Sequence, residues 1–469
     1  MMPPPPLLAA IRTGISPAHV AVVVLLLAVY LAMSKNPLDP VLWTTPFPLP
    51  PLQRNSLLAT AARFGRKVAM APESFAMDPV TGLVYSSLGD GRVVALTEKG
   101  QYASLVFFTG DHAPSDAAKD RDEVLAWCMR EGRAGRLAWH PERERACGRP
   151  LGLRLRQVRG ATLLYVLDAY HGLFSIDMSD RSRSVRHLIH SNTTITPSPG
   201  GDTELLTRPP LFFNDLDVSS EGVVYLTDSS YKHTRSENRR ELLDAAPRGR
   251  VFSFWPKEHG GDGELRPLLC GLHFPNGVQL AAGAKSLLVV ESARFRVLKL
   301  ELSQLSAAVT GRLTSSCGEN GPLFQLLDNA TARASYPARS GAPVGVFLDR
   351  IPGFPDNIRA DCKRPGYYFV GCGTKSAQPF SLLWTAYQNT ALRLLVGKLV
   401  PMRFVEHLVP RYGLVLHTDG AGGGSTLQDP RGRVALVSEA QRHPVTGDLW
   451  MGSHSNKFVS ILPSADLHV

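Results

Sequence analysis

Five residues whose side-chain oxygen atoms could bind a metal ion lie at the starts of similar predicted strands: Glu73, Asn214, Asn276, Asp356 and Asn357. Carboxylate and amide oxygens are hard ligands, and Ca²⁺ binds about six to eight of them in flexible geometries. Two carboxylates and three neutral amides carry a formal charge of −2, which balances a divalent cation. Zinc would favour His or Cys, which these strand openers lack. The pattern predicts a calcium site, and the competing interpretation is that Asn and Asp cap turns before strands.

A repeated hairpin positions these openers. The stretch FFNDLDVSSEGVVYLTDSS, residues 212–230, predicts two strands around a Ser-Glu-Gly turn. Its second strand recurs six times at intervals of roughly 60 to 80 residues, a period typical of propeller blades, and the copies are centred on Tyr85, Tyr165, Tyr225, Val289, Tyr368 and Trp450. The chain is therefore predicted to be an all-β, six-bladed β-propeller, in which the innermost strands converge on one axis. A β-sandwich with duplicated hairpins is the alternative.

Composition narrows the functional classes. The 469 residues are 44% hydrophobic and carry a formal net charge of +10, and ten arginines fall within residues 121–159. A basic run can bind nucleic acid or an anionic membrane, but few aromatics interleave here, so we expect a solvated insertion and no nucleic-acid partner. The six cysteines show neither a CxxC pair nor a zinc spacing. Cys362 and Cys372 flank a turn and a strand, which favours buried free thiols.

The N-terminal region predicts a membrane anchor. Residues 1–14 are expected to be a short cytoplasmic tail, and residues 15–33 are almost continuously apolar. As a helix this segment rises about 28 Å, close to the thickness of a bilayer core, which predicts a transmembrane signal anchor. A cleaved signal peptide is the alternative, although small residues at a cleavage site are not obvious. Residues 34–56 are proline-rich and predict an extended stem outside the core, followed by the propeller over 57–469.

Two sequons and several insertions complete the chain. Asn192 and Asn329 lie in N-x-T sequons within polar connections, so both are candidate glycosylation sites of a lumenal or extracellular propeller. Residues 111–149 are expected to be partly helical, and 229–250 to form a loop with a short helix. Residues 380–399 favour a packed connecting helix, with a lid or a membrane-leaning element as alternatives.

Six stretches together resemble the strictosidine synthase-like family over residues 57–469: CGRPLGLRL, LLYVLDAYHGLFSID, FFNDLDVSSEGVVYLTDSSYK, GLHFPNGVQL, VVESARFRVLKL and IPGFPDNIRAD. The resemblance implies a six-bladed propeller and a type II membrane orientation. Relatives bridge a loop before their CGR motif, which implies a disulfide between Cys128 and Cys147. A secretory compartment permits such a bridge.

The openers are also similar to those of paraoxonases and gluconolactonases, which are calcium-dependent hydrolases. That similarity assigns the five opener residues as calcium ligands. The first position of the paraoxonase His dyad falls near residues 150–152, which contain no His, and the second falls beside His171. Asp168 and His171 are therefore the nearest candidates for a general base. Strictosidine synthase uses a Glu in its last blade, where this chain has Ser438 with Glu439 one step away, so amine condensation is not expected.

The function expected from the sequence is a membrane-anchored, calcium-dependent hydrolase of small carboxylic, arylesterase-type esters. Its partners are a small ester substrate and the membrane that the N-terminal helix spans. We place it in the plasma membrane or in the endoplasmic reticulum and secretory pathway. The alternative is a non-catalytic, calcium-stabilised propeller that acts as a binding or adhesion module.

Overall fold

The computed structural model describes residues 19, 22, 25, 26, 33, 35–41, 52–66, 68–112, 120–180, 182–190, 193–195, 208–257, 263–302, 344–376, 388–405 and 409–467. Among these residues, no helix combines the length and the apolar character needed to cross a bilayer. Most of the predicted anchor, residues 15–33, lies outside the described residues. Both sequon asparagines, Asn192 and Asn329, lie outside them as well.

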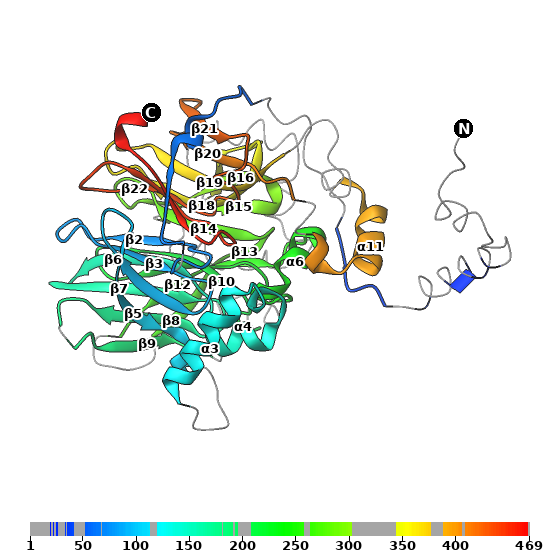
Figure 1. Cartoon of the computed structure of the whole chain (residues 1–469), viewed down its shortest axis with the longest axis horizontal. Helices are drawn as coiled ribbons and strands as arrows, with labels where there is room; N and C mark the ends of the chain where they lie inside the picture. The colour runs from blue at the N-terminus through cyan, green and yellow to red at the C-terminus, as the bar shows by residue number, and fades with distance from the viewer. Residues whose placement is uncertain are drawn as a thin grey trace, which may run out of the picture.

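Six antiparallel sheets of four strands form the molecule, which confirms the six-bladed propeller (Figure 1). The first three blades are β2 (Phe75–Met77), β3 (Val84–Ser87), β4 (Arg92–Leu96), β5 (Tyr102–Phe108); β6 (Pro150–Val158), β7 (Ala161–Asp168), β8 (Gly172–Asp177), β9 (Val185–Ile189); and β10 (Phe213–Val218), β11 (Val224–Asp228), β12 (Gly249–Trp255), β13 (Glu264–Leu272). The last three are β14 (Pro275–Leu280), β15 (Ser286–Glu291), β16 (Arg296–Glu301), β17 (Val344–Leu348); β18 (Gly353–Ala360), β19 (Tyr368–Lys375), β20 (Gly413–Thr418), β21 (Gly424–Asp429); and β22 (Ala440–Arg442), β23 (Leu449–Met451), β24 (Val459–Leu462) with β1 (Ala62–Phe64).

The repeated sequence stretch is the second strand of every blade: β3, β7, β11, β15, β19 and β23. These strands are buried on both faces because each blade is covered by a blade on either side. Leu167 of β7, Leu216 of β10 and Leu226 of β11 belong to one apolar cluster between two blades. Burial on both faces explains the near-continuous apolar runs that mark the repeat.

The ring is closed by the N-terminal strand. β1 pairs with β24 and completes the last blade, with Ala62 opposite Ile461 and Phe64 opposite Val459. The last blade therefore takes its outermost strand from the start of the propeller and the others from its end. This closure joins the two ends of the domain through backbone hydrogen bonds.

The helical insertions gather on one side of the propeller, where residues 35–41 also run (Figure 1). They are α3 (Arg121–Arg133), η3 (Leu137–Trp139), α4 (Pro141–Cys147), η4 (Arg235–Glu237), α6 (Asn238–Asp244), α11 (Thr390–Leu399) and α12 (Met402–Val405). The short turns η1 (Leu57–Thr60), η2 (Thr109–His112), η5 (Ser292–Arg294) and η8 (Ser464–Asp466) complete the assignment. The predicted helices within residues 111–149 and 229–250 are thus confirmed.

The arginine-rich insertion is folded, and five of its six arginines between residues 121 and 145 are exposed to solvent, as expected for a solvated insertion. A disulfide joins Cys128 of α3 to Cys147 at the end of α4. Glu131 is buried and pairs with Arg136 and Arg143, at 3.0 Å for the latter. Arg149 is buried as well. These ion pairs and the disulfide let a polar segment fold without a large apolar core.

Residues 35–41 also differ from the expected free stem. Asn36 donates to the carbonyl of Leu394 at 3.0 Å, and the Val41 amide donates to the carbonyl of Asp244 at 3.0 Å. Leu38 is buried beside Gly397 of α11. This segment therefore packs on α6 and α11. α11 is a packed connecting helix, as predicted, because its Arg393 is fully buried against these neighbours.

The two free thiols have different environments. Cys372 lies in β19 and is buried, as expected, whereas Cys362 is exposed. The prediction that both thiols are buried was therefore wrong for Cys362. It lies in the turn between β18 and β19, where the chain leaves the sheet.

Candidate functional site

Bulges in the innermost strands present the opener residues. Between Phe213 and Leu216, β10 advances three residues while its partner β11 advances two, from Asp228 to Leu226. The same extra residue occurs in β14 between Pro275 and Val278, and in β18 between Pro355 and Ile358. Asn214, Asn276 and the pair Asp356–Asn357 lie in these bulges. A bulge turns a side chain out of the regular alternation and is common beside active sites.

The bulges face a cavity of about 120 Å³. Four of the five predicted ligands line it: Glu73, Asn214, Asn276 and Asp356. These residues come from four blades, so the fold brings together positions that are far apart in sequence. Its apolar wall comprises Leu151, Phe212, Leu242, Leu243, Phe274, Phe354, Val405, Val409 and Leu436. The fifth residue, Asn357, is buried but is not among the lining residues.

The asparagine side chains have a consistent orientation. Asn214 Nδ2 donates to Ser229 Oγ at 2.9 Å, and Asn276 Nδ2 donates to Ser292 Oγ at 3.2 Å. Asn357 Nδ2 lies 3.4 Å from Glu439 Oε2. The amide oxygens of Asn276 and Asn357 are buried and have no hydrogen-bond partner among the residues that the structure describes. An unpaired buried carbonyl costs about 1–3 kcal/mol, so these two oxygens are available as ligands in a way that turn-capping side chains are not.

Serine hydroxyls fix the openers by linking successive blades. Ser229 Oγ, which accepts from Asn214, donates to the carbonyl of Pro275 at 2.7 Å. Ser292 Oγ, which accepts from Asn276, donates to the carbonyl of Pro355 at 2.5 Å. Each asparagine is thus held by a serine that also holds the opener of the next blade. This second layer of contacts sets the direction of the amide oxygens, as in orienting shells around metal sites.

The two carboxylates occupy electrostatically different positions. Glu73 is buried and forms an ion pair with Arg149 at 2.7 Å. Burial, together with the negative charges of Glu73, Asp215 and Glu439, raises the pKa of Asp356 well above its usual value, although a hydrogen bond from Asn276 opposes the shift. A nearby cation would stabilise the ionised form of Asp356. The donor set and its electrostatics therefore fit a hard divalent cation.

A separate ionic cluster lies behind the openers. Arg359 pairs with Asp215 at 2.8 Å and with Glu439, and Glu439 also accepts from Ser74 and from the amide of Phe75. Glu439 is fully buried, and the hydroxyl of Ser438 donates to the carbonyl of Glu73 at 3.1 Å. Neither residue is among those that line the cavity. Glu439, the glutamate of the last blade, is therefore engaged in contacts that hold the blades together and does not line the cavity.

The proposed base residues do not reach this cavity. Asp168 Oδ1 accepts from the amides of Tyr170 and His171, and its Oδ2 accepts from the amide of Arg149 at 2.6 Å. His171 Nε2 lies 2.8 Å from the carbonyl of Arg145. Neither Asp168 nor His171 appears among the described lining residues. The structure thus places Asp168 at the end of β7 and His171 in the turn that follows, where these polar atoms bind backbone groups.

Several lining residues were not singled out by the sequence: Arg235, Asn238, Arg239 and His454. Burial and the charges of Arg239, Arg235 and Arg149 hold the pKa of His454 well below its usual value, so this imidazole is neutral. The arginine run did contain Arg149, which pairs with Glu73. Arg235, Asn238, Arg239 and His454 do not lie at the start of an innermost strand. They belong to an insertion and to the last blade, so the repeated motif could not indicate them.

Within the described part of the chain, no three side chains among His, Cys, Asp and Glu cluster as a metal site would require. The candidate set contains only two carboxylates, Glu73 and Asp356, and its other three members are asparagine amides. It is therefore not a cluster of that kind. Its support comes from the convergence on one cavity, the two unpartnered amide oxygens and the raised pKa of Asp356.

The chain is similar to several known proteins. A family model described as strictosidine synthase matches residues 214–304. The chain is 32% identical over 432 residues to the adipocyte plasma membrane-associated protein of Bos taurus, covering 90% of this chain and 84% of the relative. It is 27% identical to the strictosidine synthase-like 10 protein of Arabidopsis thaliana, with coverage of 84% and 85%. A gluconolactonase structure from Xanthomonas campestris aligns with a TM-score of 0.44 and 13% identity, covering 91% of this chain and 98% of that one.

The fold is a six-bladed propeller, and the strictosidine synthase model matches only part of it, in β10 to β16. The chain belongs to the family of the adipocyte plasma membrane-associated proteins.

Proposed function

We propose that the propeller is a calcium-dependent hydrolase of small carboxylic esters, with arylesterase-type activity. The observation that carries the proposal is the buried amide oxygen of Asn276, which has no hydrogen-bond partner among the described residues and belongs to a cavity that Glu73 and Asp356 also line. The amide oxygen of Asn357, next to Asp356 in the chain, is buried without such a partner as well. Asn214, Asn276, Asn357, Glu73 and Asp356 would hold the ion. When bound, calcium would supply a Lewis acid that polarises an ester carbonyl and stabilises an oxyanion.

The chain's own residues would bind and orient the substrate. Phe212, Phe274 and Phe354 lie on the apolar wall beside the opener residues, where an aryl or acyl group would displace water. The serine-linked asparagines keep the polar floor rigid, which reduces reorganisation during the reaction. We assign the general base to neither Asp168 nor His171, because their polar atoms are engaged with backbone groups.

The absence of Asp168 and His171 from the described cavity wall favours a second candidate function. In that case the propeller retains calcium for rigidity and acts as a binding or adhesion module. Both candidates require the same ion, so they differ in turnover and not in metal binding.

We also propose that the protein is a type II membrane glycoprotein of the plasma membrane or the secretory pathway. The relatives named for plasma-membrane association support this placement, as do the apolar segment 15–33 and the sequons at Asn192 and Asn329. Disulfide bonding at Cys128–Cys147 fits an oxidising compartment.

The test is turnover of phenyl acetate by purified protein, with calcium and after treatment with a chelator. The hydrolase proposal predicts turnover that chelation abolishes and calcium restores. Asn276→Ala should lower this activity. Asn55→Ala provides a control, because Asn55 hydrogen-bonds Thr426 and Gln428 away from the cavity-lining residues. Calcium binding without any turnover across a panel of aryl esters would favour the binding module instead.

A further inference from the structure

The outward face of α11 is apolar. Ala391, Leu395 and Leu399 follow one another at intervals of four residues, so they lie along one face of this helix. All three are exposed, Leu395 by 42% and Leu399 by 40%. The exposed face of a surface helix is ordinarily polar. This apolar stripe therefore indicates a surface that meets an environment other than water.

The opposite face of α11 holds the chain that leads to the propeller. Arg393 and Gly397 each lie two positions from Leu395, which places them about 200° around the helix from it. Arg393 is fully buried and donates to the carbonyl of Val41 at 2.5 Å. A Cβ atom on Gly397 would lie 2.6 Å from Leu38 Cδ1, so glycine leaves the space that this leucine occupies. The helix thus has its charge inside and leucines outside, the reverse of an ordinary surface helix.

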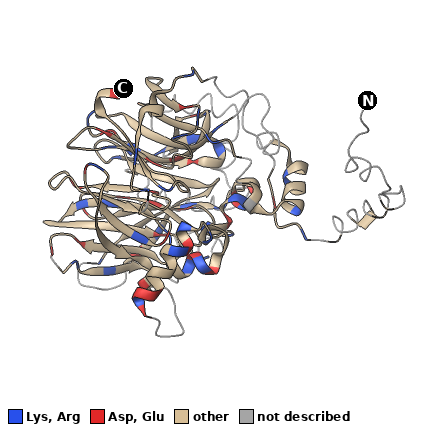
Figure 2. Cartoon of the chain, viewed as in Figure 1, with Lys and Arg blue, Asp and Glu red and all other residues tan. Residues whose placement is uncertain are grey.

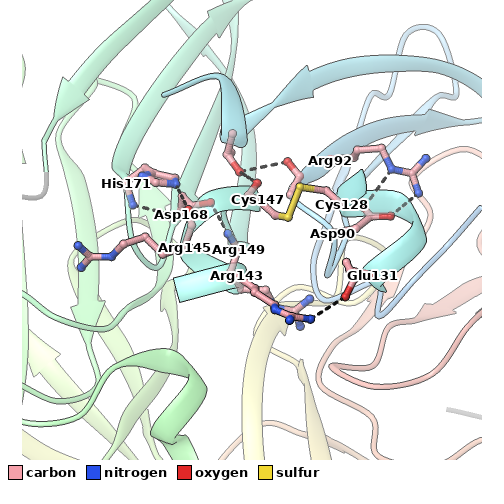
Figure 3. Close-up of a disulfide and its surroundings, with 12 residues drawn as sticks. Asp90, Arg92, Cys128, Glu131, Arg143, Arg145, Cys147, Arg149, Asp168 and His171 are labelled. Atoms are coloured by element: carbon pink, nitrogen blue, oxygen red, sulfur yellow. Dashed lines mark hydrogen bonds and ion pairs between the residues drawn. A yellow bond between two sulfur atoms is a disulfide. The ribbon is translucent and has the colours of Figure 1, made fainter. Parts of the chain in front are cut away.

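The helix α3 has the ordinary arrangement and serves as a comparison. Its Cys128 turns inward to the disulfide with Cys147 (Figure 3), and the residues that it exposes include Arg121, Asp122 and Glu123. Figure 2 shows acidic and basic residues on α3 but only basic ones on α11. The helix α11 therefore presents leucines without any carboxylate that would repel an anionic lipid headgroup.

The chain between α11 and the predicted membrane anchor is short. Asn36 donates to the carbonyl of Leu394 in α11 at 3.0 Å. It follows Met33, the last residue of the predicted span, by three positions. Three residues of extended chain reach at most about 11 Å, and the headgroup layer of one leaflet is roughly 5 to 8 Å thick. A bilayer that contains the span therefore has its headgroups within a few ångströms of α11.

We propose that the outward face of α11 lies against the lipid bilayer and inserts its leucines into the headgroup layer. The inference rests on the proposed membrane anchor and does not require the proposed hydrolase. Within the predicted span, Met33 is 82% exposed, Leu25 63% and Leu26 62%, so they present apolar surface that lipid would also cover. A protein partner would cover leucines as well, but the short connection brings lipid to this face in every molecule.

This contact sets which side of the propeller faces the membrane. Leu243 of α6 lines the candidate cavity, and its carbonyl accepts from Arg393 of α11 at 2.8 Å. Val405 of α12 lines the cavity as well. Figure 1 shows α6, α11 and residues 35–41 on the same side of the propeller. The cavity side therefore turns toward the bilayer, and the turn that contains Val80, at the far end of the innermost strand β2, turns away from it.

Two leucines and a distant valine provide matched labelling sites. Leu395→Cys, Leu399→Cys and Val80→Cys each replace an exposed apolar residue, and Val80 is 88% exposed. All three carry Cys362→Ser, which removes the exposed free thiol, while Cys372 is buried. Each full-length variant is labelled with a thiol-reactive fluorophore and reconstituted into vesicles of phosphatidylcholine and phosphatidylserine. An unchanged melting temperature shows that the label has not disturbed the fold.

The readout is quenching by phosphatidylcholine that carries bromine near the top of its acyl chains. Labels at positions 395 and 399 should lose most of their fluorescence, because bromine quenches on contact, whereas the label at position 80 should lose almost none. Equally weak quenching at all three positions overturns the proposal. A label at position 395 that is shielded from aqueous iodide but not quenched by the brominated lipid identifies a protein partner, and overturns it as well.

Flotation with the vesicles after carbonate extraction separates this inference from the anchor. Protein that floats with unquenched labels at positions 395 and 399 keeps the anchor and refutes the α11 contact alone. Protein that does not float refutes both. As a second variant, Leu395→Asp in the Leu399→Cys protein should reduce quenching at position 399, because a carboxylate is costly at this depth, and Val80→Asp should not. Unchanged quenching in Leu395→Asp would contradict a contact through this face.

Discussion

Replacement of Glu241 by Gln should remove a pH dependence of stability from the helix that walls the cavity. Glu241 is fully buried in α6, and its Oε2 accepts from Ser230 at 2.6 Å. Within the described part of the chain, its Oε1 has no hydrogen-bond partner. Burial raises the pKa of Glu241 to about 7, even though Arg248, Ser230 and His233 favour the ionised form and Asp244 adds to the rise.

The sign follows from proton binding. Because the folded state holds this proton more tightly than the unfolded chain, the contribution of Glu241 is greatest below its ordinary pKa and is lost as pH rises through 7. A rise from 4.5 to about 7 corresponds to about 3 kcal/mol between pH 4.5 and 8. The pKa of the neighbouring Asp244 is lowered to about 2, so its protonation changes stability only at a pH below 4.5, outside the range in which Glu241 titrates.

Urea unfolding at intervals between pH 5 and 8 measures this effect. The wild type should lose more stability across the range than Glu241→Gln, whose amide has a similar shape but does not titrate. Subtracting the two curves isolates the residue from the other titrating groups. Parallel curves for the two proteins would refute the reasoning, because Glu241 would then have the same pKa folded and unfolded.

Three further predictions concern other parts of the chain. Cys128→Ser with Cys147→Ser should lower the free energy of unfolding by about 3 kcal/mol, seen in urea titrations, and native-like stability would contradict it. Arg149→Met should leave Glu73 without its cation and make thermal unfolding more dependent on calcium than in the wild type, and an unchanged calcium dependence would argue against a shared site. Replacing residues 1–35 with a cleavable secretion signal should release protein into the medium, whereas a full-length protein already soluble after carbonate extraction would exclude the anchor.

The sequence predicted the propeller because its signal is local and repeated. Each second strand is buried on both faces, so an apolar run such as LLYVLD at Tyr165 carries the signature without knowledge of its neighbours. The four opener residues that line the cavity were equally accessible to sequence reasoning, because they open innermost strands that converge on the axis. Glu73 and Asn276, for example, lie 203 positions apart and still line one cavity.

The rest of the site depends on tertiary contacts that no local pattern encodes. The arginine run is largely solvated, as its composition indicated, but the sequence does not show which of its charges find a partner, as Arg143 does in Glu131. Residues 35–41 resembled a linker by proline content, although Asn36 and Val41 bind α11 and α6. Asp168 and His171 resembled catalytic groups in chain position, but their hydrogen bonds cap a turn. Such assignments depend on the partner that a polar atom finds, which the sequence does not specify.

The most direct test of the central claim is a calorimetric titration of calcium into chelator-stripped protein, comparing wild type with Asn276→Ala and Asn55→Ala. If the opener residues share one ion, the wild type and Asn55→Ala should bind calcium alike, and Asn276→Ala should bind it more weakly. The melting temperature should fall on chelation, because the ion binds only the folded state. No heat of calcium binding in the wild type, with a melting temperature unmoved by chelator, would contradict the account and return these residues to turn capping.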